Sequence, residues 1–140
     1  METRCRLGSE MIMNPSNYID VFRKLVDLAL EYQFRSNDLN DYEPAFLAVL
    51  RFIETADSDL RNKIDEEFVK MLQSQKCQVH ELIEYCTRKM QFQKVKMCAK
   101  ELIDTSKDFR TKTVMSEILK AYDKVWSGED VYWYYRNQRI

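Results

Sequence analysis

The chain has 140 residues, of which 45% are hydrophobic and 32% charged, a composition typical of a globular protein with one core. Only two glycines and two prolines are present, too few for the frequent turns of a β-sandwich or barrel. The net charge of −1 argues against a strongly basic nucleic-acid-binding chain, and no apolar run is long enough for a membrane span or a signal peptide.

Residues 1–13 show no helical pattern, and we expect them to form a mobile leader. A single all-helical domain is predicted over residues 14–140. Its first helix begins at Asn14 and Pro15, because asparagine caps helix N-termini and proline suits the first turn. Apolar residues then recur every three or four positions as far as Phe34.

A second helix is predicted over residues 42–55, with Asp41 as its N-terminal cap, and a third over residues 59–73. The third helix contains the acidic triplet Asp65-Glu66-Glu67. Consecutive residues point in different directions around a helix and do not converge on one site. We therefore predict that this triplet forms an exposed face.

Two further helices are predicted over residues 79–90 and 93–105, with Phe92 at their short connection. A connection this short predicts an antiparallel pair. A sixth helix is predicted over residues 111–126, ending at Ser127-Gly128, where glycine would act as a C-terminal cap. Six amphipathic helices close as a bundle or stack as a short α-solenoid of hairpins, and periodicity alone does not separate these alternatives.

The segment Val79-His80-Glu81-Leu82-Ile83-Glu84-Tyr85-Cys86-Thr87-Arg88-Lys89-Met90-Gln91-Phe92-Gln93-Lys94-Val95 resembles a pentatricopeptide or tetratricopeptide helical hairpin. The resemblance lies in the order of apolar positions, the bulky turn residue and the helix that follows, and it covers about one repeat. Arg88-Lys89-Met90 stands where those families have a small residue, and the chain shows no second clear copy. No base-reading or peptide-clamping residue is carried over.

The sequence shows no recognisable catalytic motif. The lone histidine, His80, has Glu84 four residues later and Cys77 three residues earlier, but a tetrahedral metal site needs further ligands that no spacing supplies. The only glycines, Gly8 and Gly128, form no phosphate-binding loop. We therefore expect no catalytic residue, no metal and no cofactor, and we interpret the four cysteines as reduced residues of an intracellular protein.

The C-terminal segment, residues 130–140, has four consecutive aromatic residues followed by two arginines. In one interpretation Asp130 caps a short seventh helix whose face of Val131, Tyr134 and Tyr135 seals the core against Trp126. In the other, part of the segment stays exposed as an interface, because Tyr, Trp and Arg concentrate binding energy. The candidate interface residues are Tyr132, Trp133, Tyr135, Arg136 and Arg139.

These observations predict a non-catalytic protein–protein interaction module of an intracellular assembly, with self-association as a variant and no membrane contact. The alternative is a helical-repeat domain that binds single-stranded RNA, with base stacking on the aromatic rings. Residues 86–140 carry 12 Lys and Arg against 7 Asp and Glu, whereas residues 1–85 carry 10 against 16. Phosphate contacts would come from Arg136, Arg139, Lys120 and Lys124.

Overall fold

A computed structural model describes residues 14–74 and 78–138, and the predicted leader over residues 1–13 lies outside them. The predicted all-α fold is confirmed, since every regular element in the described residues is helical. None of these helices is both long enough and apolar enough to span a membrane. The elements are α2 (Pro15–Arg35), α3 (Leu39–Glu54), α4 (Ser58–Gln73), α5 (Val79–Met90), α6 (Gln93–Thr105), α7 (Phe109–Leu119), the 3-10 helix η1 (Lys120–Tyr122), α8 (Gly128–Val131) and α9 (Trp133–Arg136).

Polar caps set the starts of the first helices. The side chain of Asn14 accepts a hydrogen bond from the backbone N–H of Asn17 (2.9 Å), and Pro15 occupies the first turn of α2, as predicted. The α3 helix begins earlier than predicted, because Asp38 rather than Asp41 caps it. Asp41 instead lies in the first turn, where its negative charge interacts favourably with the positive end of the helix dipole.

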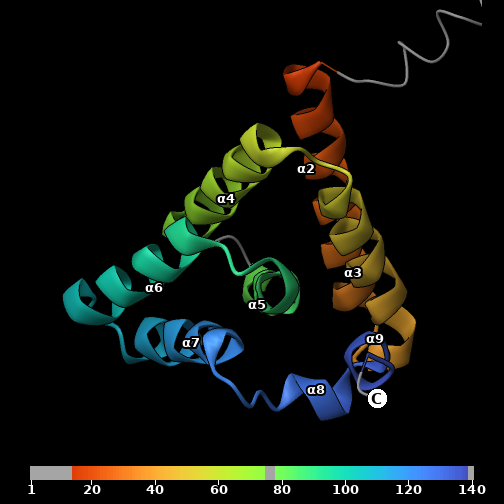
Figure 1. Ribbon diagram of the computed structural model, residues 1–140. Helices are drawn as coiled ribbons and strands as arrows, with labels where there is room; N and C mark the ends of the chain where they lie inside the picture. Colours follow the sequence, from red (N-terminus) through yellow and green to blue (C-terminus); the bar gives the residue numbers. More distant parts are fainter. Residues whose placement is uncertain (1–13, 75–77, 139–140) are drawn as a thin grey trace, which may run out of the picture.

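The helices form a bundle around α5, which resolves the alternative between bundle and solenoid. In Figure 1, the pairs α2 and α3, α4 and α6, and α7 and α8 outline the three sides of a triangle, and α5 is seen end-on inside it. Packing on several sides explains why α5 buries more than one face. Its buried residues are Val79, Leu82, Ile83, Tyr85, Cys86 and Thr87.

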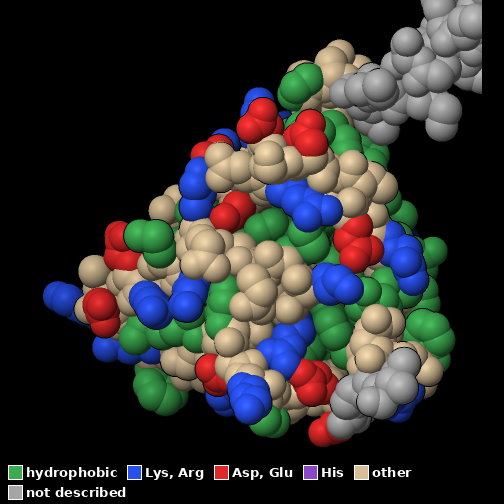
Figure 2. Space-filling model, in the orientation of Figure 1, with side chains coloured by type: hydrophobic (Ala, Val, Ile, Leu, Met, Phe, Trp, Pro, Cys, Tyr) green, Lys and Arg blue, Asp and Glu red, His purple; other side chains and the backbone are tan. Residues whose placement is uncertain are grey.

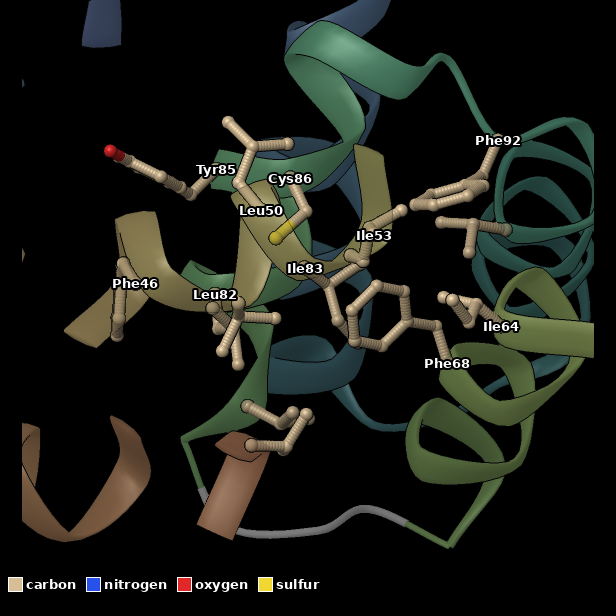
Figure 3. Packing of buried hydrophobic residues seen from close by; sticks show 14 of the residues in the cluster. Phe46, Leu50, Ile53, Ile64, Phe68, Leu82, Ile83, Tyr85, Cys86 and Phe92 are labelled. Atoms are coloured by element: carbon tan, nitrogen blue, oxygen red, sulfur yellow. The ribbon is translucent and has the colours of Figure 1, made fainter. Parts of the chain in front are cut away.

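The core forms where α3 and α4 meet this central helix. Figure 3 shows side chains from α3, α4 and α5 converging, with the ring of Phe92 alongside them. The rings of Phe68 and Phe92 meet edge-to-face with their centroids 5.7 Å apart. Such a contact adds about 0.5–1.5 kcal/mol to the gain from burial alone.

The predicted antiparallel pairing of α5 and α6 is wrong. Figure 1 shows α5 end-on, whereas α6 runs across the view and packs beside α4 and α7. Gln91 ends α5 in the left-handed region (φ 52°), and Phe92 follows with an extended backbone. The Gln91 amide also donates to the carbonyl of Ala121 (3.2 Å), which ties this sharp turn to η1.

The prediction that the acidic triplet is exposed is wrong for two of its three residues. Asp65 is buried, and its carboxylate accepts hydrogen bonds from two backbone N–H groups in the first turn of α6 (2.9 and 3.0 Å). Glu67 is buried beside Arg23 of α2, whose guanidinium donates to both carboxylate oxygens (2.8 and 3.0 Å). Only Glu66 is exposed. The three carboxylates therefore point in different directions around α4, with Asp65 bound to α6 and Glu67 bound to α2.

The helix predicted over residues 111–126 ends early, at Leu119, and continues only as the single turn of η1. The guanidinium of Arg88 donates to the carbonyls of Ala121, Asp123 and Lys124. A continuing α-helix would bond such carbonyls internally, to N–H groups four residues later. Arg88 on the central helix therefore replaces the helical bonds of this stretch.

Gly128 does not have the predicted role of a C-terminal cap, because it opens α8 and its φ is not positive. It is buried against Trp126, and a Cβ atom on Gly128 would lie only 2.2 Å from the indole ring. Glycine is thus required at this position by the close approach of Trp126 to the backbone.

Candidate interaction surface

The C-terminal segment folds back onto the core through a layer of aromatic rings. Trp126 is buried, with Tyr132 stacked on it (centroids 5.8 Å apart) and Tyr135 edge-on to it (5.0 Å). The hydroxyl of Tyr135 donates to the backbone carbonyl of Tyr85 on α5. This layer confirms that the segment seals the core, as one of the two interpretations predicted.

A buried carboxylate on α3 fixes the start of α9. Glu43 Oε1 accepts a hydrogen bond from the backbone N–H of Trp133 (2.8 Å), and Oε2 accepts one from the N–H of Tyr134 (3.0 Å). The hydroxyl of Tyr85 also donates to Oε2 (2.9 Å). The first N–H groups of a helix have no acceptor within the helix, and this carboxylate accepts their hydrogen bonds. Its negative charge also interacts favourably with the positive N-terminal end of the short helix. Glu43 therefore sets the position of Trp133.

Two cationic side chains lie close to the ring of Tyr134. Arg51 of α3 lies with its guanidinium carbon 5.7 Å from the centroid of this ring, and the Lys89 ammonium of α5 lies 6.0 Å from it. Contacts of this kind contribute about 0.5–1 kcal/mol at exposed sites. Tyr134 is buried, so α9 is anchored by its side chains as well as by its backbone.

The structure divides the predicted interface residues. Tyr132 and Tyr135 are only 7% and 6% exposed, so both belong to the core, contrary to the interface prediction. Trp133 is 54% exposed and Arg136 is also exposed. Arg139 lies outside the described residues.

The physical reason for this division is a break between the two short helices. Tyr132 has an extended backbone (ψ 130°) between α8 and α9, so the predicted single helix is two separate turns. Val131, expected to be buried, is therefore 52% exposed. Tyr132 turns inward in its place, and the next outward-facing ring is that of Trp133.

A small pocket of about 230 Å³ lies beside Trp133. Its lining residues are Asn40, Glu43, Pro44, Leu47 and Trp133. The contribution of α3 was not predicted, because these residues lie about 90 positions before Trp133 in the chain. One signal was present, since Leu47 is an apolar residue that falls outside the buried stripe of its helix.

Arginines border the apolar part of this surface. Arg51 follows Leu47 by one turn of α3, and Arg136 follows Trp133 by one turn of α9. Within the described residues neither arginine forms an ion pair. We call the surface formed by Pro44, Leu47, Arg51, Trp133 and Arg136 the Trp133 surface.

The described residues do not bring the candidate metal ligands of the sequence together at one site. His80 is half-buried and burial lowers its pKa, while Cys77 lies outside the described residues. The described part of the chain contains no group of three or more side chains placed to hold a metal ion. Glu84 turns to the core instead, where its carboxylate accepts a hydrogen bond from the indole N–H of Trp126 (2.5 Å).

The two lysines considered for phosphate contacts differ in their surroundings. Lys120 forms an ion pair with Glu117 (2.9 Å), and Lys124 is exposed. Figure 2 shows Lys and Arg side chains interspersed with Asp and Glu over the visible face. On that face the distribution differs from the continuous basic stripe typical of nucleic-acid-binding proteins.

Comparison of the chain with protein-family models, with curated proteins and with solved structures found no match.

Proposed function

We propose that the chain is a non-catalytic protein-interaction module of an intracellular assembly, and that it binds its partner through the Trp133 surface. The observation that carries this proposal is the 54% exposure of Trp133 on a segment whose neighbouring rings are buried. Tryptophan and arginine are enriched among residues that dominate binding energy. An exposed Trp with an apolar pocket and two arginines beside it has the composition of such a contact.

The local structure supports the proposal because Trp133 is held before any partner arrives. Glu43 bonds its backbone N–H, and the buried ring of Tyr134 follows it directly. A side chain on an anchored backbone loses less conformational entropy on binding than one on a mobile terminus. This anchoring distinguishes Trp133 from an apolar residue that is exposed at random.

The test is affinity purification of the tagged full chain from cells that naturally produce it, with bound proteins measured by quantitative mass spectrometry. Trp133→Ala is compared with Phe109→Ala, which removes an aromatic ring that is 82% exposed at the start of α7. We expect specific partners to be lost with Trp133→Ala and kept with Phe109→Ala. Equal capture by both variants, with circular dichroism unchanged, would contradict the proposal.

Self-association is the variant in which the partner is a second copy of the chain. Light scattering measures this directly, since a dimer that becomes a folded monomer on Trp133→Ala would place the contact at the Trp133 surface. A point variant is needed here, because removing the segment after Gly128 would also strip Tyr132 and Tyr135 from the core.

A further inference from the structure

The Trp133 surface is apolar at one end and cationic at the other. Pro44, Leu47 and Arg51 follow one another at spacings of three and four on α3, so they lie along one side of that helix. Trp133 and Arg136 repeat the order on α9. Arg51 approaches the ring of Tyr134, so the cationic end of α3 lies beside α9.

The size of the pocket limits what enters it. Pockets that hold whole small molecules measure about 300–1,000 Å³. The pocket beside Trp133 measures about 230 Å³ and is partly enclosed by Pro44 and Leu47. Its dimensions suit one bulky apolar side chain projecting from a peptide segment.

The Trp133 surface carries positive charges that are not paired with carboxylates of the described residues. Among the described residues, the only carboxylate lining the pocket belongs to Glu43, which is buried and already accepts three hydrogen bonds. Lys89 has Glu54 nearby (3.9 Å), but Arg51 and Arg136 have no carboxylate partner within the described residues. A partner that fits must therefore bring its own carboxylates.

From this geometry we infer that the Trp133 surface binds an acidic peptide segment of the partner protein, with one Leu, Phe or Trp in the pocket and Asp or Glu beside Arg51 and Arg136. The inference rests on the proposed function and names the chemistry of the partner. Arginine suits this role because its planar guanidinium pairs with a carboxylate through two parallel hydrogen bonds.

The experiment selects ligands from a display library of random twelve-residue peptides on the immobilised full chain, with Trp133→Ala as the subtraction bait. Enriched peptides are synthesised, and their Kd is measured against the wild type, Arg136→Glu, Arg51→Gln and Lys112→Glu. Arg136→Glu alters an exposed side chain that makes no described contact, so the fold of this variant is expected to survive. Lys112→Glu reverses an exposed charge on α7 and serves as the matched control.

We expect the enriched peptides to combine one bulky apolar residue with Asp or Glu. Trp133→Ala and Arg136→Glu should each weaken binding at least about tenfold, which corresponds to about 1.4 kcal/mol, while Lys112→Glu leaves the Kd unchanged. Arg51→Gln should also weaken binding. The wild-type Kd should rise with sodium chloride concentration, because salt screens the pairing of exposed charges.

Several results would overturn the inference. Peptides that require Trp133 but contain no acidic residues, or that are insensitive to Arg136→Glu, would refute it and leave the proposed function standing. The absence of any Trp133-dependent peptide would also refute it, and the purification from cells would then decide the proposed function separately. Displacement of the peptides by a single-stranded RNA that itself requires Trp133 would assign the surface to nucleic acid.

Discussion

The carboxylate of Glu43 on α3 accepts a hydrogen bond from the hydroxyl of Tyr85 on α5 (2.9 Å), and both side chains are buried. The same carboxylate bonds the backbone N–H groups of Trp133 and Tyr134, so one residue joins the central helix to the C-terminal segment. An isolated carboxylate in the core would be strongly destabilising. The hydrogen bonds from these three donors offset the cost of burying the carboxylate. Each donor in turn uses Glu43 as its hydrogen-bond acceptor.

Replacing Glu43 with alanine is therefore expected to destabilise the fold by about 2–4 kcal/mol, since it leaves buried donors without an acceptor. Tyr85→Phe removes one donor and leaves the two backbone bonds, so we expect a smaller loss of about 1 kcal/mol. Urea unfolding measures both changes. Hydrogen exchange of the Trp133 and Tyr134 amides should accelerate strongly only in Glu43→Ala, and equal exchange in the two variants would contradict the anchoring role.

Gly128→Ala is expected to destabilise the fold by about 1–3 kcal/mol, because a Cβ atom would collide with the indole ring of Trp126. Ser127→Ala is the matched control, since it alters an exposed residue one position earlier. Both are measured by urea unfolding in a Trp133→Phe background, so that Trp126 is the only tryptophan. A native fluorescence spectrum and unfolding midpoint in Gly128→Ala would show that the ring does not pack against this residue.

The sequence predicted the helices with local signals well and the contacts between distant segments poorly. The bounds of α5 and α6 match the prediction, because apolar spacing and the Phe92 connection are local features. The end of α7 depends on Arg88, which lies more than 30 residues earlier and bonds carbonyls that the predicted helix would have used. Periodicity carries no information about such a competitor.

The candidate surface was predicted only in part for the same reason. Aromatic density drew attention to Trp133, which is exposed, but the break at Tyr132 changed which neighbouring rings face outward. The sequence also could not predict that Glu43 binds the C-terminal segment or that Asp65 binds the start of α6. The backbone N–H groups that donate to these carboxylates lie 29 or more residues away in the chain. A buried carboxylate and an exposed one look alike until the chain is folded.

Asp65→Ala is expected to destabilise the fold by about 1–3 kcal/mol, since the first turn of α6 loses the carboxylate that accepts two of its N–H bonds. Asp65→Asn keeps one oxygen acceptor and should lose less. Glu66→Ala is the control from the same turn of α4, because Glu66 is exposed and forms an ion pair with the Lys94 side chain. Thermal unfolding ranks the three variants, and equal midpoints for Asp65→Ala and Glu66→Ala would rule out the capping role.

The raised pKa of Glu84 is expected to make the stability of the fold depend on pH. Burial, aided by Glu117 and Glu81, raises the pKa of its carboxyl group to about 7 from an ordinary value of 4.5, although the hydrogen bond from Trp126 opposes the rise. The folded state thus binds a proton between pH 4.5 and 7 that the unfolded state has already released. Stability from this group is present at low pH and falls as the pH rises through this window.

Glu84→Gln keeps an oxygen to accept the Trp126 bond and removes the charge. At pH 8 we expect it to be more stable than the wild type by about 1–2 kcal/mol, a value reduced for solvent screening of a partly exposed group, and nearly equal to it below pH 4.5. Urea unfolding of both proteins from about pH 4 to pH 8 gives the difference curve. Because His80 titrates in both proteins, its own contribution largely cancels in that difference. Parallel curves would mean that Glu84 is ionised throughout, and that the Trp126 hydrogen bond offsets the effect of burial on its carboxylate.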